Sequence, residues 1–144
     1  LTVIDYSDVG VLINNKSEAS KTIGWAFVNA RNISTDRIFI FNDSETPTAE
    51  TINREQFENY FMLPFFEMLN NRSLGNTLNY LVTTKGIPLR INGGNDKASF
   101  DQEFSLLGGQ YNGSIGANSW VNHQYGPLAG TRGHGGKLSL GGAA

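Results

Sequence analysis

The residues best placed to do chemistry are the polar ones that close three apolar stretches of the chain, residues 9–15, 36–43 and 78–84. Parallel strands end at one border of their sheet, and α/β proteins bind ligands there, so polar side chains at this border would form a crevice for a small ligand. The candidates for this ligand rim are Asn14, Asn15, Asn42, Asp43, Thr83, Thr84 and Lys85. The alternative is that these residue types only make turns and caps after the strands.

Lys85, Asp101 and Glu103 are the weak candidates for catalysis. A lysine at a strand end can bind an anion or pair with either acid, although an exposed lysine is usually only solvated. The two acids could also hold a divalent cation through oxygen ligands. We favour a simpler interpretation, in which Ser99 caps a helix and the acids occupy its first turn. We therefore expect no metal and no cofactor.

The two histidines, His123 and His134, give little support to a catalytic or metal site. They stand in Gly-rich sequence without a metal-binding spacing, and the chain has no Cys to complete a zinc site. No G-x-S-x-G motif makes any serine a nucleophile for a histidine to activate. We do not expect either histidine to be catalytic.

Composition limits the class of protein. The chain has 144 residues, 17% of them charged, a net charge of −2 and no run of Lys or Arg, which argues against nucleic-acid binding. The longest apolar run, residues 60–66, is too short to span a bilayer, so we expect no transmembrane segment. The chain begins with Leu1 rather than Met, so we expect a processed or partial chain.

Five Asn-x-Ser triplets are present, more than the roughly two that chance predicts from 16 Asn and 21 Ser and Thr. Their asparagines are Asn15, Asn32, Asn42, Asn71 and Asn112. The excess favours an exported glycoprotein, with coincidence as the alternative.

The elements that must position these residues follow from hydrophobic periodicity. Three short apolar runs alternate with two segments of helical spacing, a β-α-β-α-β order that predicts three adjacent parallel strands joined by right-handed crossovers. We expect an α/β fold: a three-layer sandwich with helices on both faces of a mainly parallel sheet.

Local signals place the helix ends. Ser17 is the predicted N-cap of the first helix, and Asn53 with Gln56 forms a capping-box pattern at the second. Pro64 lies inside the second helix and predicts a kink or two abutting helices. The expected apolar stripe of the first helix is Ala19, Ile23, Ala26, Phe27 and Ala30.

The C-terminal part of the sequence differs from the rest. We expect an α/β domain over residues 1–107 and an irregular Gly-rich arm over residues 108–144, with Gly108 ending a short helix that Ser99 caps. The arm is too poor in large apolar residues to form its own core. It can be an arm that packs on a neighbour, a functional loop or a piece of a longer native chain.

Three stretches, residues 50–58 (ETINREQFE), 80–91 (YLVTTKGIPLRI) and 98–107 (ASFDQEFSLL), together resemble an uncharacterised family of secreted bacterial and archaeal proteins associated with exosortase-type sorting systems. The residues that fall on the family pattern are Glu50, Thr51, Arg54, Thr84, Lys85, Gly86, Pro88, Ser99, Asp101 and Glu103. Asn53, Phe100 and Gln102 depart from it, and family members are usually longer. The resemblance implies export and an α/β fold and brings no established activity.

Two functions remain open. The first is an extracellular cell-surface protein, a glycosylated structural subunit that self-assembles into a sheath, layer or filament. The alternative is a secreted hydrolase-like enzyme with its ligand site at the carboxyl ends of the parallel strands. A peptide-binding role lies between the two.

Overall fold

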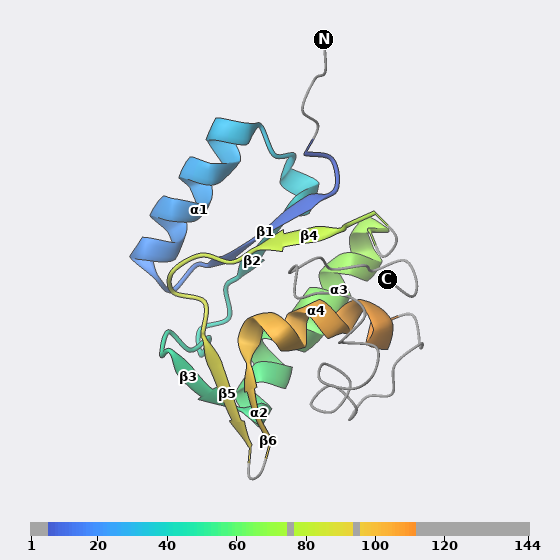
Figure 1. Cartoon of the computed structure of the whole chain (residues 1–144). Helices are drawn as coiled ribbons and strands as arrows, with labels where there is room; N and C mark the ends of the chain where they lie inside the picture. Colours follow the sequence, from blue (N-terminus) through green and yellow to red (C-terminus); the bar gives the residue numbers. More distant parts are fainter. Residues whose placement is uncertain (1–5, 75–76, 94–95, 112–144) are drawn as a thin grey trace.

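A computed structural model describes residues 6–74, 77–93 and 96–111 of the chain (Figure 1). Its strands are β1 (Val9–Asn14), β2 (Ile38–Phe41), β3 (Thr51–Asn53), β4 (Tyr80–Val82), β5 (Arg90–Gly93) and β6 (Asp96–Ser99). The predicted β-α-β-α-β order is confirmed: β2, β1 and β4 form a parallel sheet in that order, which we call sheet A.

Helices cover both faces of sheet A. The α-helices are α1 (Glu18–Arg31), α2 (Arg54–Phe57), α3 (Leu63–Arg72) and α4 (Phe100–Tyr111). Side chains alternate between the two faces along a strand. In β1, Val11 and Ile13 lie on the face of sheet A that α1 covers, and Leu12 lies on the opposite face. The α1 side closes over Val28 and Ile33.

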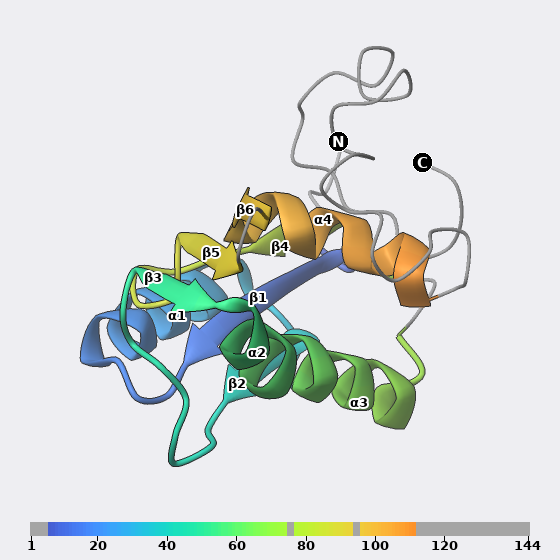
Figure 2. The ribbon, with the colours of Figure 1, turned by 90° about the horizontal axis from the view of Figure 1, so that it is seen from below.

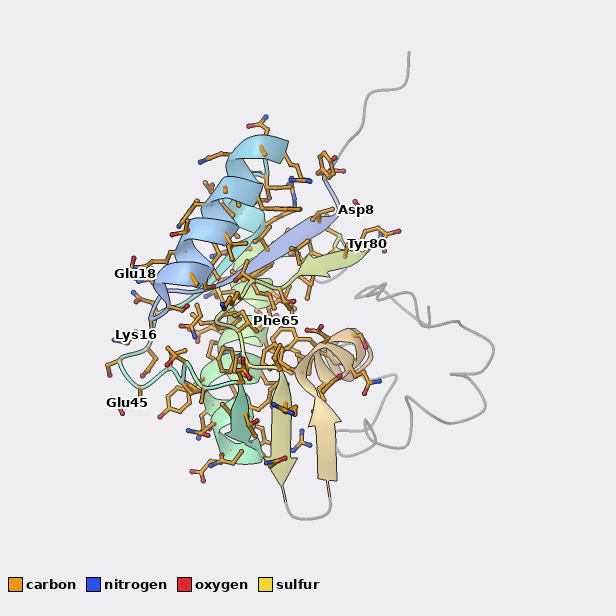
Figure 3. The ribbon with its side chains drawn as sticks, turned by 60° about the vertical axis from the view of Figure 1, so that its left-hand side comes forward. Asp8, Lys16, Glu18, Glu45, Phe65 and Tyr80 are labelled. Carbon is orange, nitrogen blue, oxygen red and sulfur yellow. The ribbon has the colours of Figure 1, made fainter. Side chains whose placement is uncertain are left out.

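The opposite face of sheet A carries the larger core. It is dominated by buried phenylalanines from β2, from the helical segment that runs from α2 to α3, and from α4: Phe39, Phe41, Phe57, Phe61, Phe65, Phe100 and Phe104. Most of their ring pairs are tilted or edge-to-face, the geometry that aromatic quadrupoles favour. Phe65 lies between sheet A and α4 (Figure 3).

Gly10, in the central strand β1, has no room for a side chain. A Cβ atom there would lie 2.8 Å from both Leu81 Cδ2 and Phe39 Cε2. Side chains from the two outer strands therefore approach each other across the backbone of β1, and only glycine leaves room for them.

The stripe expected for α1 is wrong. Its buried residues are Ser20, Gly24 and Val28, and Ile23 is 46% exposed. A Cβ on Gly24 would lie 2.6 Å from Ile13 Cγ1, so the helix packs on the sheet through small residues instead of through its larger apolar ones.

The disruption expected at Pro64 is confirmed. A π-helical segment, Glu58–Met62, separates α2 from α3, and Leu63 N–H donates to Glu58 O, five residues earlier. Proline has no N–H to donate, so the hydrogen-bond pattern changes just before it. Figure 2 shows α2 and α3 following each other as one long helical segment.

A second, small sheet was not expected from the sequence. β3 pairs in parallel with β5, and β5 pairs with β6 as an antiparallel hairpin. Each of these strands overlaps one of the three stretches that carry the family resemblance. β5 and β6 lie in residues 90–99, to which the sequence analysis assigned no strand.

The C-terminal helix confirms its predicted cap and extends past its predicted end. Ser99 Oγ accepts a hydrogen bond from Gln102 N at 3.1 Å, as an N-cap does. α4 continues to Tyr111, through Gly108 and the boundary placed at residue 107. Residues 112–144, which include His123, His134 and Asn112, lie outside the described part of the chain.

Within the described ranges, none of the helices has the length and apolar character needed to cross a bilayer.

Candidate functional site

The carboxyl ends of the sheet A strands meet at one border, as expected. Asn15, just after β1, donates from Nδ2 to Asn42 Oδ1, just after β2, at 2.7 Å. Lys16, Glu18 and Glu45 lie at this end of the molecule, and Asp8 and Tyr80 lie at the opposite end (Figure 3). The parallel order therefore brings the predicted rim residues of β1 and β2 together.

Asn14 is the centre of this border, and its side chain is fully buried. Its Nδ2 donates to Pro47 O and to Gly86 O, both at 2.9 Å. Its Oδ1 accepts from Lys16 N at 3.0 Å. Both hydrogens of the amide are donated and its oxygen accepts a hydrogen bond. Asn14 therefore links β1 to the segments that follow β2 and β4.

A second set of hydrogen bonds joins β1, α1 and β4. Ser20 Oγ accepts from Asn14 N at 2.8 Å and lies 2.5 Å from Thr84 Oγ1. Thr84 Oγ1 donates its one proton to Leu12 O at 2.9 Å, so Ser20 is the donor to Thr84. Each hydroxyl is both donor and acceptor, and the arrangement leaves neither free to bind a ligand.

The bend after β4 closes over the start of α1. Gly86 has φ +113°, a conformation that favours glycine. A Cβ there would lie 2.6 Å from Ser17 Cβ and closer still to Ser17 Oγ. Ser17 is itself the N-cap of α1, confirmed by the 3.2 Å bond from Ser20 N. The protein's own backbone thus occupies the space above the helix N-terminus.

The predicted rim divides into a buried and an exposed set. Asn14 and Thr84 are buried in the hydrogen bonds just described, and Asn15 is half-buried. The exposed members of the set are Asn42, Asp43, Thr83 and Lys85. Asp43 accepts from Glu45 N at 2.9 Å, the Asx-turn that the alternative interpretation predicts.

The catalytic candidates lie in different surroundings. Glu103 is 2% exposed and its Oε2 is 2.5 Å from Arg54 Nη1, so this carboxylate joins α4 to α2. Asp101 and Lys85 are exposed. Among the described residues no three His, Asp or Glu side chains gather as a group that could hold a metal ion.

Ser20 and Arg54 are structural residues to which the sequence analysis gave no structural role. Ser20 belongs to the hydrogen bonds around Thr84, and Arg54 belongs to the separate pair with Glu103. Ser20 gives no sequence signal, because a serine three residues after a cap reads as part of an exposed helix turn. Arg54 and Glu103 stand 49 positions apart, and each lies in one of the stretches that carry the family resemblance. That shared membership was the available clue to their contact.

No family model, no curated protein and no solved structure matches the chain. The interpretation of this border therefore rests on its geometry.

Replacing Thr84 by Val tests whether the buried border is structural. Valine keeps the shape but leaves Leu12 O and Ser20 Oγ without their partner, so we expect the free energy of unfolding to fall by about 2 kcal/mol. Chemical denaturation of the purified chain measures this. Thr83→Val is the matched control: that side chain is exposed, and we expect a change below about 0.5 kcal/mol. Equal effects at the two positions would contradict the structural role.

Proposed function

We propose that the chain is an extracellular cell-surface domain, N-glycosylated and self-associating, that serves as a structural subunit of a surface assembly. The observation that carries this proposal is the placement of the Asn-x-Ser triplets. The family resemblance, which implies export, supports it independently. The structural use of the strand-end border also supports a scaffold more than a catalyst.

The triplet asparagines in the described ranges lie at the surface. Asn32, Asn42 and Asn71 are exposed, and Asn15 is half-buried. Asn32 ends α1 in a left-handed conformation with φ 53°, and Asn42 follows β2. Turns of this kind present the amide for modification, as an acceptor site requires.

These asparagines are also unevenly placed. Asn32 precedes β2, Asn42 follows it, and Asn71 is next to Arg72, whose guanidinium contacts the β2 backbone. Residues 77–111, which contain β4, hold no such triplet. Sugars at these three sites would lie on the β2 side of sheet A.

We expect the protein from its native source to carry sugar on Asn32 and Asn42. Asn15 should carry less, because its Nδ2, the atom that would be modified, donates to Asn42 Oδ1. Mass spectrometry of glycopeptides measures the occupancy of each site. Asn32→Gln should remove one glycan, and Asn29→Gln, an exposed asparagine outside any triplet, should remove none. A native protein at its bare mass would remove the glycoprotein part of the proposal.

The hydrolase alternative has less support. Glu103 is buried against Arg54, and the two buried members of the rim, Asn14 and Thr84, are fully used in hydrogen bonds within the protein. A general acid or base must reach the proton that it transfers. Lys85 and Asp101 are the candidates that solvent reaches.

A further inference from the structure

The two edge strands of sheet A, β2 and β4, differ in what covers their outer backbone groups. At the β2 edge, Arg72 Nη1 donates to Asp36 O at 3.0 Å and to Ile38 O at 2.7 Å. Ile38 O points away from β1, because Phe41 O, three residues later in the same strand, points toward it. The guanidinium carbon also lies 5.3 Å from the centroid of the Phe39 ring. A strand could pair with β2 only by displacing Arg72.

The β4 edge has no such cover within the described residues, where β1 is the only strand that pairs with it. Tyr80 N–H donates to Asp8 O at 3.2 Å, so Tyr80 and Val82 turn their backbone groups toward β1 and Leu81 turns its groups outward. Tyr80 is 43% exposed, and Leu81 and Val82 are only half-buried. None of the residues Tyr80–Val82 is the charge or proline that usually protects an edge.

We propose that the β4 edge pairs with the β4 edge of a second copy of this chain. The two strands run antiparallel about a two-fold axis beside Leu81, so that Leu81 exchanges both backbone hydrogen bonds with Leu81 of the partner subunit. The two three-stranded sheets become one continuous six-stranded sheet. This inference rests on the self-association in the proposed function and names the surface responsible.

The two-fold pairing is chemically self-complementary. Residues equally spaced before and after Leu81 face each other, so Tyr80 faces Val82 and Asn79 faces Thr83. An aromatic residue opposite a β-branched one is a favourable cross-strand pair. Tyr80–Val82 carry no charge, and Lys85, the nearest charged residue after β4, lies beyond the paired strand, so no like charges are opposed within the pairing. This match is why we assign the edge to a second copy rather than to an unrelated strand.

The predicted sugar positions agree with this assignment. An interface strand must stay free of glycans; none of the five triplets falls within residues 77–111, and three of them, at Asn32, Asn42 and Asn71, lie before, after or beside β2. Because Arg72 occupies part of the β2 edge, we expect strand pairing to stop at two copies. A closed pair is the commonest symmetric oligomer.

Sedimentation velocity of the full chain, from about 1 µM to about 1 mM, tests the pairing. We expect a concentration-dependent dimer. Leu81→Pro removes the outward N–H together with a side chain that packs over Gly10, so it should weaken dimerisation and also lower the stability of the monomer. Tyr80→Lys adds an edge charge at a residue that is 43% exposed, and it should weaken dimerisation at least about tenfold while the thermal unfolding midpoint of the monomer stays close to that of the original chain. Leu89→Lys changes an equally apolar residue that is 55% exposed elsewhere, and its dimerisation should be unchanged.

Two results would overturn the pairing. Association that survives both Leu81→Pro and Tyr80→Lys places the contact on another surface and leaves the proposed function standing. A monomer at every concentration, with the Leu81 amide protected from hydrogen exchange, shows that the chain covers its own edge. If that monomer also has its bare sequence mass when taken from the native source, the proposed function fails as well.

Discussion

Replacing Gly86 by Ala should lower the free energy of unfolding by about 4 kcal/mol, the sum of backbone strain and overpacking, each about 1–3 kcal/mol. Gly86 has φ +113°, which alanine adopts only with strain. The added Cβ would also lie 2.6 Å from Ser17 Cβ and 3.0 Å from Ser20 Cβ, at the buried start of α1. Neither neighbour can move without losing the hydrogen bonds that Ser17 and Ser20 make.

Urea denaturation of the purified chain measures this change. Lys85→Ala is the matched control. Lys85 precedes Gly86 in the sequence and its side chain is exposed, so we expect the free energy of unfolding to change by less than about 0.5 kcal/mol. Adding Ser17→Gly to Gly86→Ala removes the contacts with the Ser17 side chain but not the 3.0 Å approach to Ser20 Cβ or the backbone strain, and a glycine cap costs only a few tenths of a kcal/mol. The double variant should therefore recover part of the loss. A single variant as stable as the original chain would show that the bend is not closed over α1.

Replacing Arg54 by Met should cost about 3–5 kcal/mol, because it removes the cation beside a buried carboxylate. Glu103 is 2% exposed and Arg54 18% exposed, so water cannot replace the guanidinium at that oxygen. The same denaturation experiment measures the loss. It should appear as a lower denaturant midpoint with an unchanged slope, since the surface exposed on unfolding is the same.

The double variant Arg54→Met with Glu103→Leu separates the charge from the packing. Apolar residues in place of both ions often restore or exceed the original stability, so we expect it to be more stable than Arg54→Met alone. Arg90→Met is the surface control. Its partner Glu50 lies 3.9 Å away and both side chains are more than half exposed, so its loss should be below about 1 kcal/mol. If Arg54→Met behaved like Arg90→Met, the buried pair would have no structural role.

Signals that are local in sequence predicted much of the fold. The caps at Ser17, Asn53 and Ser99 depend on one side chain and an amide a few residues away, and all three are confirmed. The parallel order of sheet A followed from apolar runs separated by helices, because crossover connections have one favoured hand. The disruption before Pro64 followed from the missing N–H.

Features that depend on contacts distant in sequence could not be predicted. Hydrophobicity selected Ile23 for the buried face of α1, but a close approach to Ile13 selects Gly24. β3 has three residues with one buried side chain, which is too little periodicity to distinguish from a turn. Strand pairing with β5, formed far along the chain, is what makes it a strand.

The sequence predicted where the polar residues of the candidate site lie, but not that they bind one another. The strand ends of sheet A do meet, as Asn15 and Asn42 show, because parallel strands must end together. Polar residues at such a border can face a ligand or one another, and composition does not distinguish the two. The bend at Gly86 covers Asn14 and Thr84, so these two residues are buried and bind other parts of the protein.

Gly10 has a mechanical consequence for the molecule. Because Phe39 and Leu81 nearly meet across the central strand, the outer strands support each other as well as their common neighbour. A load applied to either one is shared by both, so the three strands should open together as a single cooperative unit, and peeling from one border should not occur first.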